Sequence, residues 1–270
     1  MDTVKYPKYN RPRKVGAYNC LNRNYCLLSQ LPFPTRVLDI GCGVGETTKL
    51  LTFFNNVIQV VAVDKAADAV AVADCFNDDL RIRYELADVE DFCTLPKSSE
   101  NSFNLATAFH SLQFVENHDM TARNILKALK PGGYFLCTLP ARPNQRDLDL
   151  KQFLYESKRW RACRQGTQNG QRVLAWLDKS DPASWYREVL ARNGFEIERC
   201  DLINEEIAIS EEEASEYLKM SRLRHFNVAD SDYEEFVEQA SQAYSKSCTK
   251  LGGGYVSWSF DTIDVAARKV

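Results

Sequence analysis

The chain has 270 residues, enough for one large α/β domain or a smaller domain with a long insertion, and two full domains are less expected. Hydrophobic residues make up 44% and charged residues 26%, so neither a disordered nor a fibrous protein is indicated. A formal net charge of -3 argues against a general electrostatic attraction to nucleic acid.

From residue 36 onward, short apolar runs alternate with helix-like stretches. Buried strands are expected at residues 37–40, 57–63, 80–86, 103–108 and 134–139, and further strands at 195–201 and 255–267. Strands that alternate with helices pack as a parallel sheet covered on both faces. The pattern therefore predicts an α/β fold with a Rossmann-like, doubly wound, seven-stranded and mostly parallel sheet. Residues 1–34 are expected to form an N-terminal arm and one helix.

Two long stretches, residues 141–180 and 205–252, interrupt this pattern and are expected as helical cap insertions. Connections of more than about a dozen residues in compact domains are often functional, so both are candidate covers of a substrate. The first stretch interleaves basic and aromatic residues, among them Trp160, a candidate substrate contact. A solvated helix face is the favoured interpretation of its basic residues, and an anion-binding surface is the alternative. These basic residues are Arg142, Arg146, Lys158, Arg159, Arg161 and Arg164.

A glycine-rich segment follows the first predicted strand and carries the strongest functional signal. It reads Asp39-Ile40-Gly41-Cys42-Gly43-Val44-Gly45, and a helix is expected after it. A ligand can lie against such a turn only if no Cβ atom stands in its way, and Gly41 and Gly43 meet that condition. The turn is therefore predicted to hold a cofactor; a tight turn without a ligand is the alternative.

Carboxylates end the next two predicted strands. Asp64 follows the apolar run 60–63, where a carboxylate can accept hydrogen bonds from both hydroxyls of a ribose. Asp88 and Val89 follow the third strand, where the carboxylate can accept from an adenine amino group and the Val89 amide can donate to a ring nitrogen. Each aspartate alone also fits a structural role, Asp64 as a solvated turn residue and Asp88 as a helix N-cap.

These residues, from about Arg36 to Leu139, resemble the class I S-adenosylmethionine-dependent methyltransferases. The resemblance implies that Asp39 and the glycines hold the methionine part of the cofactor, that Asp64 holds its ribose, and that Asp88 and Val89 hold its adenine. Cys42, Lys65 and Phe109 are implied as further cofactor contacts. The spacing of Gly41, Gly43 and Gly45 is the methyltransferase-like form, whereas dinucleotide enzymes favour G-x-G-x-x-G, so a hydride-transfer enzyme is a weak rival.

The segment after the fourth predicted strand carries the candidate catalytic residues, His110 and Gln113. Ligands of open parallel sheets lie beyond the carboxyl ends of the strands, so both side chains are expected to face the methyl group. His110 would position or deprotonate the acceptor and Gln113 would orient it; a structural role for His110 is an equal alternative. This segment resembles the small-molecule branch that includes trans-aconitate and juvenile hormone acid methyltransferases, which esterify carboxylates. Phe114, a candidate substrate contact, replaces the tryptophan usual in that branch.

The sequence thus predicts a cytoplasmic methyltransferase of a small molecule, acting as a monomer or homodimer and without nucleic acid or membrane as partner. The nine cysteines include no C-x-x-C pair, and no metal site is expected. Residues 35–270 are expected to form the methyltransferase domain, with the insertions named above. A protein or nucleic-acid methyltransferase and a catalytically inactive, cofactor-binding regulatory protein remain alternatives.

Overall fold

The computed structural model describes residues 11–96, 99–142, 145–161, 179–221, 228–246 and 248–270. The chain divides into two compact units. We call Arg11–Ala141, Lys179–Ile203 and Thr262–Val270 the sheet unit, and Met1–Asn10, Arg142–Asp178 and Asn204–Asp261 the helical unit. The beginning of the predicted arm, residues 1–10, and residues 162–178 of the first predicted insertion, Arg164 included, lie outside the described residues.

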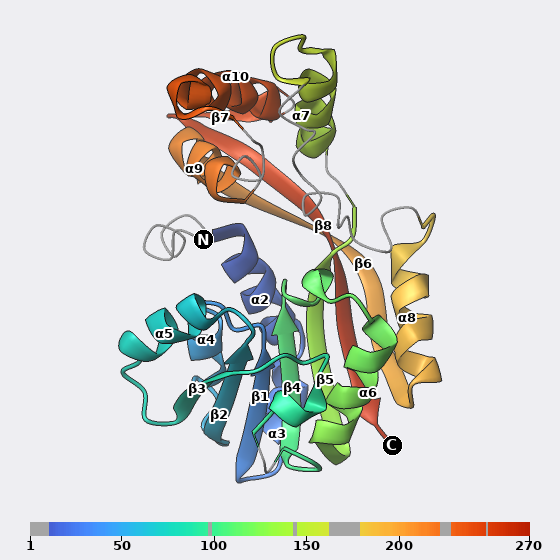
Figure 1. Ribbon diagram of the computed structural model, residues 1–270. Coiled ribbons are helices and arrows are strands. Elements are labelled where there is room, and N and C mark those ends of the chain that lie inside the picture. The colour runs from blue at the N-terminus through green and yellow to red at the C-terminus, as the bar shows by residue number, and fades with distance from the viewer. Residues whose placement is uncertain (1–10, 97–98, 143–144, 162–178, 222–227, 247) are drawn as a thin grey trace. The chain divides into compact units, whose positions relative to one another are not determined.

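Five parallel strands form the centre of the sheet unit (Figure 1). They are β1 (Thr35–Ile40), β2 (Val57–Asp64), β3 (Ile82–Leu86), β4 (Phe103–Phe109) and β5 (Leu129–Pro140), in the order β3-β2-β1-β4-β5. β8 (Tyr255–Lys269) pairs antiparallel with β5, and β6 (Phe195–Ser210) comes after β8 in the sheet order. Every residue of β4 is buried, as expected for a parallel strand covered on both faces. The predicted mostly parallel, Rossmann-like sheet is confirmed.

The predicted number of seven strands was one too low, because the described residues form eight. The additional strand is β7 (Lys250–Gly252), which pairs with β8. Three residues are too few to show the alternation by which strands are recognised in a sequence. Gly253 and Gly254, between β7 and β8, have positive φ values and close this short hairpin.

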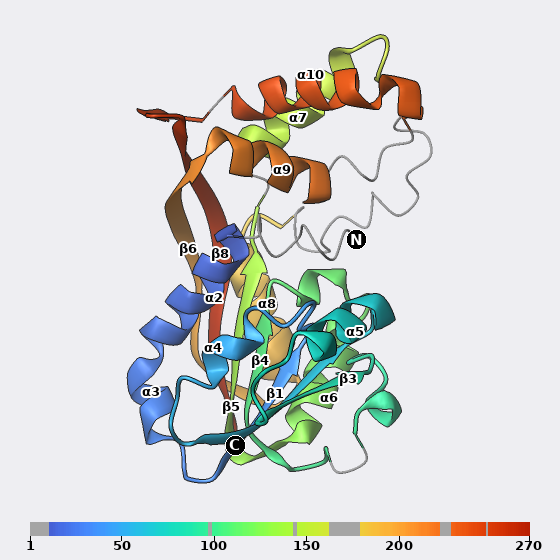
Figure 2. The same cartoon turned by 90° about the vertical axis from the view of Figure 1, so that its left-hand side faces the viewer.

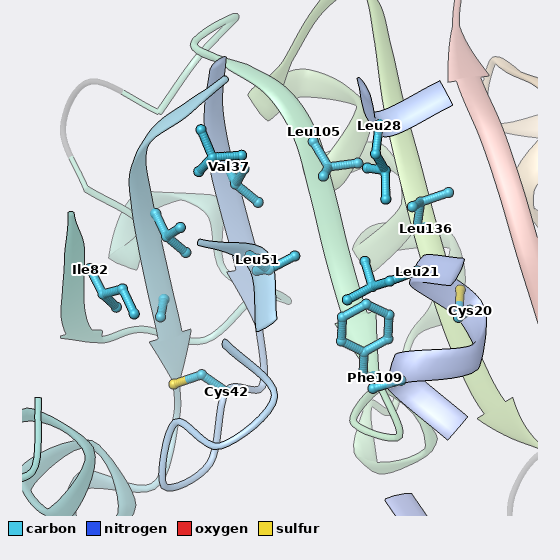
Figure 3. Packing of buried hydrophobic residues seen from close by; sticks show 14 of the residues in the cluster. Cys20, Leu21, Leu28, Val37, Cys42, Leu51, Ile82, Leu105, Phe109 and Leu136 are labelled. Carbon is cyan, nitrogen blue, oxygen red and sulfur yellow. The ribbon is translucent and has the colours of Figure 1, made fainter. Parts of the chain in front are cut away.

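Helices cover both faces of the sheet (Figure 2). α2 (Arg11–Arg23), α3 (Tyr25–Gln30) and α4 (Thr48–Leu51) lie on one side, and α6 (His118–Ala128) and α8 (Pro182–Arg192) lie on the other. α5 (Ala67–Cys75) connects β2 to β3. α6 and α8 begin at side-chain N-caps, where Asn117 and Asp181 accept hydrogen bonds from backbone amides of the first turn. Leu21 of α2 and Leu28 of α3 pack against Leu105 and Leu136 of the sheet (Figure 3).

The helical unit has a core of its own. It contains α7 (Gln145–Glu156), α9 (Glu211–Ser221), α10 (Tyr233–Ser245) and the adjoining parts of β6 and β8. α9 begins with a capping box, in which Ser210 Oγ accepts from Glu213 N and Glu213 Oε2 accepts from Ser210 N, each at 3.0 Å. Buried aromatic side chains from Trp160, Phe236 and Trp258 fill this core. No helix in the described part of the chain combines the length and the apolar character that crossing a membrane requires.

Candidate cofactor site

The three glycines of the turn after β1 all have positive φ values, but their surroundings differ. A Cβ on Gly41 would lie 2.2 Å from the Ser111 Cβ, and a Cβ on Gly45 would lie 2.3 Å from the Tyr84 hydroxyl. A Cβ on Gly43 would meet no atom within 4 Å. Gly41 and Gly45 are therefore required for packing beneath the turn, whereas Gly43 presents bare backbone to open space.

Asp64, at the end of β2, lies beside this open backbone. Its Oδ2 accepts a hydrogen bond from the Gly43 amide at 2.9 Å, and its Oδ1 accepts one from the Ala66 amide at 2.9 Å. The residue is half-buried, and each carboxylate oxygen keeps a second acceptor site. Asp64 can therefore accept further hydrogen bonds from a ligand that lies over Gly43. Lys65, its neighbour, is exposed, and Cys42 is buried, which raises the pKa of the Cys42 thiol.

Asp39 is placed differently from the other predicted cofactor contacts. The residue is 1% exposed, and both of its carboxylate oxygens accept hydrogen bonds from threonine hydroxyls. Thr48 Oγ1 donates to Oδ2 at 2.6 Å and Thr107 Oγ1 donates to Oδ1 at 2.7 Å. Burial raises the pKa of Asp39, and these two hydrogen bonds oppose that rise.

Asp88 and Val89 follow β3. Asp88 Oδ1 accepts from the Glu90 amide at 3.0 Å, and the Asp88 amide donates to Thr94 Oγ1 at 2.8 Å. These bonds close a local turn. Asp88 is half-buried, and its other carboxylate oxygen, Oδ2, takes no part in the turn. Val89 is buried, and its carbonyl accepts a hydrogen bond from Asn124 Nδ2 at 2.8 Å.

His110 follows β4 directly and has a φ of 50°, rare for a residue other than glycine. Its amide donates to the Thr138 carbonyl at 2.8 Å. Its imidazole lies against α2, where a Cβ on Gly16 would stand 2.7 Å from Nε2. Burial lowers the pKa of His110 to about 3, with a smaller contribution from the charge of Arg13. The imidazole is therefore neutral at physiological pH.

Gln113 forms a hydrogen bond with the backbone of His110. Its Nε2 donates to the His110 carbonyl at 2.6 Å, and its Oε1 is buried without a hydrogen-bond partner among the described residues. Both residues lie just after β4, Gln113 in the short 3-10 helix η2 (Leu112–Phe114). Phe114 is 59% exposed, whereas Phe109 is buried in the core of the sheet unit.

The glycine turn, Asp88 and His110 follow β1, β3 and β4, and Asp64 is the last residue of β2. Parallel strand pairing therefore brings them to one edge of the sheet. Trp160 belongs to the helical unit, where it is 2% exposed and donates from Nε1 to Gln239 Oε1 at 2.8 Å. Among the basic residues near it, Arg159 forms ion pairs with Asp232 and Glu235. The described residues contain no group of three or more His, Cys, Asp or Glu side chains placed to hold a metal ion.

Sequence reasoning missed the side chains that support the turn from below. These are Thr48, Thr107, Tyr84 and Ser111, none of which was singled out. Thr107 and Ser111 carried a weak signal, because they are hydroxyl residues within or just after the apolar run of β4. Ser111 Oγ donates to the Ile40 carbonyl at 2.7 Å, which ties the segment after β4 to the end of β1.

Comparison with known families agrees with this arrangement. A family model described as a methyltransferase domain matches residues 11–199, which include the turn and all the strand ends described above. The chain belongs to the methyltransferase-domain family. Together with the named relatives, this match identifies the chain as a class I S-adenosylmethionine-dependent methyltransferase.

Individual relatives of this methyltransferase are distant. Juvenile hormone acid O-methyltransferase of Bombyx mori is 22% identical over 70% of this chain and 67% of its own length. A trans-aconitate 2-methyltransferase of Variovorax paradoxus is 31% identical over 42% of each chain. The solved structure of the YcgJ protein from Bacillus subtilis is similar with a TM-score of 0.58 at 17% identity, over 93% of this chain and 98% of that one. Other matched relatives are named for a sterol and for phosphoethanolamine, so the relatives' names do not agree on an acceptor.

Proposed function

We propose that this methyltransferase binds S-adenosylmethionine across the glycine turn and transfers its methyl group to a small molecule. The observation that carries the proposal is the open backbone at Gly43, next to the acceptor oxygens of Asp64. A nucleoside needs both features, because its ribose must approach the backbone closely while its hydroxyls donate to a carboxylate. Asp88, with a carboxylate oxygen outside its own turn, is suited to accept from the adenine amino group.

For the acceptor we propose a carboxylate. When bound, S-adenosylmethionine supplies an electrophilic methyl group, and a carboxylate can take it up without losing a proton first. The state of His110 supports this choice. A general base works best with a pKa near the working pH, whereas burial holds the pKa of His110 at about 3. A neutral, weakly basic imidazole fits a positioning role, so an acceptor that needs no base suits this site better than an alcohol or an ammonium group.

Two further side chains fit an acceptor at this edge of the sheet. Gln113 Oε1 is a buried hydrogen-bond acceptor without a partner among the described residues, so a hydroxyl or protonated carboxyl elsewhere on the substrate could donate to it. Phe114 is more than half exposed and offers an apolar face. We propose that Gln113 and Phe114 orient the substrate, while the residues around the turn hold the cofactor.

The test uses the full chain with S-adenosylmethionine labelled in the methyl group and a panel of small carboxylic acids. A methyl ester releases labelled methanol in mild base, whereas N-methyl and C-methyl products keep their label. We expect base-labile product from at least one acid. Label that remains on a small product after base treatment would refute the carboxylate acceptor, label on protein or nucleic acid would refute the small molecule, and cofactor binding without any product would favour an inactive regulatory protein.

A further inference from the structure

Asp39 lies at the centre of a hydroxyl cluster beneath the glycine turn. Thr107, on β4, stands opposite Asp39 in the β1–β4 register, and Thr48 begins α4 on the far side of the turn. Tyr84, on β3, places its hydroxyl 3.4 Å from the Gly45 carbonyl and within hydrogen-bonding reach of Thr48. The turn is thus supported at both ends by side chains from three other elements.

Burial closes the carboxylate of Asp39 to a ligand that lies over the turn, whereas the half-buried carboxylate of Asp64 stays accessible. Both oxygens already accept short hydrogen bonds, and the residue is 1% exposed. A buried carboxylate held by neutral donors is costly, since hydroxyls compensate for lost water less well than a cation does. Such an arrangement is retained most readily where the hydrogen bonds fix a geometry that matters, and here they fix the two segments between which Gly41, Gly43 and Gly45 turn.

We infer that Asp39 is a positioning residue, which shapes the glycine turn through Thr48 and Thr107 and does not itself contact the cofactor. This inference rests on the proposed function of the site. It differs from what the family resemblance implies, in which the equivalent aspartate holds the methionine part. The two alternatives predict different responses to a ligand that lacks the amino acid.

Calorimetry with two ligands separates them. S-adenosylhomocysteine carries the amino-acid group, and methylthioadenosine carries the same adenosine and thioether without it. If Asp39 acts through the turn, Thr107→Val leaves Asp39 Oδ1 without its donor, and Asp39→Asn replaces one acceptor oxygen with a donor amide. Each change should weaken both ligands by the same factor, about tenfold. Thr107→Ser, which keeps the hydroxyl, should bind both ligands within about twofold of the wild type.

A matched control is available in Thr262, a fully buried strand threonine whose hydroxyl has no partner among the described residues. Thr262→Val should leave both dissociation constants unchanged. If Thr107→Val does not fold, Thr48→Val removes the other hydroxyl and gives the same comparison. A loss confined to S-adenosylhomocysteine, or no loss with either ligand, would overturn the inference. Failure of the wild type to bind either ligand would instead refute the proposed cofactor, so the two failures are distinguishable.

Discussion

Two regions of the sheet unit each bury a carboxylate, and they hold it in opposite ways. Beneath the glycine turn, Asp39 accepts from two neutral hydroxyls. Between α2, β6 and β8, Asp264 is 0% exposed and is held by two guanidinium groups. Arg23 Nη2 donates to its Oδ2 at 2.5 Å, and Arg199 donates from Nη2 and Nε to its Oδ1 at 2.6 and 2.9 Å. One buried acid is fully compensated by opposite charge, and the other is not.

This difference separates a structural role from a functional one. The Asp264 cluster joins α2 to β6 and β8. Paired charges with several hydrogen bonds are costly to break once buried. The Asp39 cluster joins only the segments around one turn and relies on neutral donors, so its loss should change the shape of a site more than the stability of the fold.

The largest effect is expected at Asp264. Asp264→Ala leaves Arg23 and Arg199 without their shared carboxylate, and should lower the free energy of unfolding by about 3–5 kcal/mol. Denaturant titration measures this loss. Where the variant is folded, its affinity for S-adenosylhomocysteine should stay within about twofold of the wild type. A loss of affinity for S-adenosylhomocysteine in Asp264→Ala as large as that in Thr107→Val would show that Asp264 also serves the cofactor site.

The next effect concerns the open backbone of the turn. Gly43→Ala should reduce affinity for S-adenosylhomocysteine at least tenfold, because the new Cβ occupies space that the nucleoside needs. The change should cost the fold only about 1–2 kcal/mol, the penalty of a positive φ for alanine. Gly254→Ala is a matched control, since Gly254 has a φ of 78° and open space around it but lies in the β7–β8 hairpin. Equal affinity for Gly43→Ala and the wild type would remove the basis of the proposed cofactor site.

A third prediction uses the buried histidine of the site. Burial lowers the pKa of His110 from 6.5 to about 3, so below pH 6.5 the unfolded chain takes up a proton that the folded chain does not. The contribution of His110 to stability is complete above pH 6.5 and is lost as the pH falls toward 3. Between pH 7 and 5 we expect His110→Gln to lose roughly 1–2 kcal/mol less stability than the wild type, because the remaining loss comes from other groups.

His118 provides the comparison for that measurement. Its pKa is lowered to about 4, also mainly by burial, and its ring packs edge-on against Trp185 at 5.3 Å. His118→Gln should therefore remove a pH dependence of the same sign while leaving methyl transfer unchanged. His110→Gln should reduce turnover more than cofactor affinity if the imidazole positions the acceptor. Unchanged turnover in His110→Gln would assign His110 to the fold alone.

The sequence predicted those features of the candidate site's local geometry that depend on a single residue and its place in the chain. A turn with positive φ needs glycine, and a carboxylate at the end of an apolar strand is visible in the chain itself, so Gly43 and Asp64 could be identified. The partners of Asp39 could not, because Thr107 meets it only through the β1–β4 register and Thr48 only through the path of the turn. The buried placement of Trp160 was hidden for a related reason, since a large aromatic residue suits a core and a substrate contact equally well.

The smallest effect is expected at Glu46. Its carboxylate is neither held by hydroxyls alone, as Asp39 is, nor fully buried between two arginines, as Asp264 is. It follows Gly45 and forms an ion pair with Lys14 of α2, and their side chains are 20% and 36% exposed. Partial burial raises the pKa of Glu46 and the lysine opposes the rise. Water still reaches both groups, so Lys14→Met should lower the free energy of unfolding by less than about 1 kcal/mol.

That substitution also tests what holds the turn. If the hydroxyl cluster around Asp39 fixes its shape, Lys14→Met should change the affinity for S-adenosylhomocysteine by less than twofold. Lys49→Met breaks a more exposed pair with Asp78 and serves as the control for removing one lysine. A tenfold loss in Lys14→Met alone would mean that the ion pair from α2 holds the turn in place. The contrast between Asp39 and Asp264 would then no longer separate function from stability, because a charged pair would be serving the site.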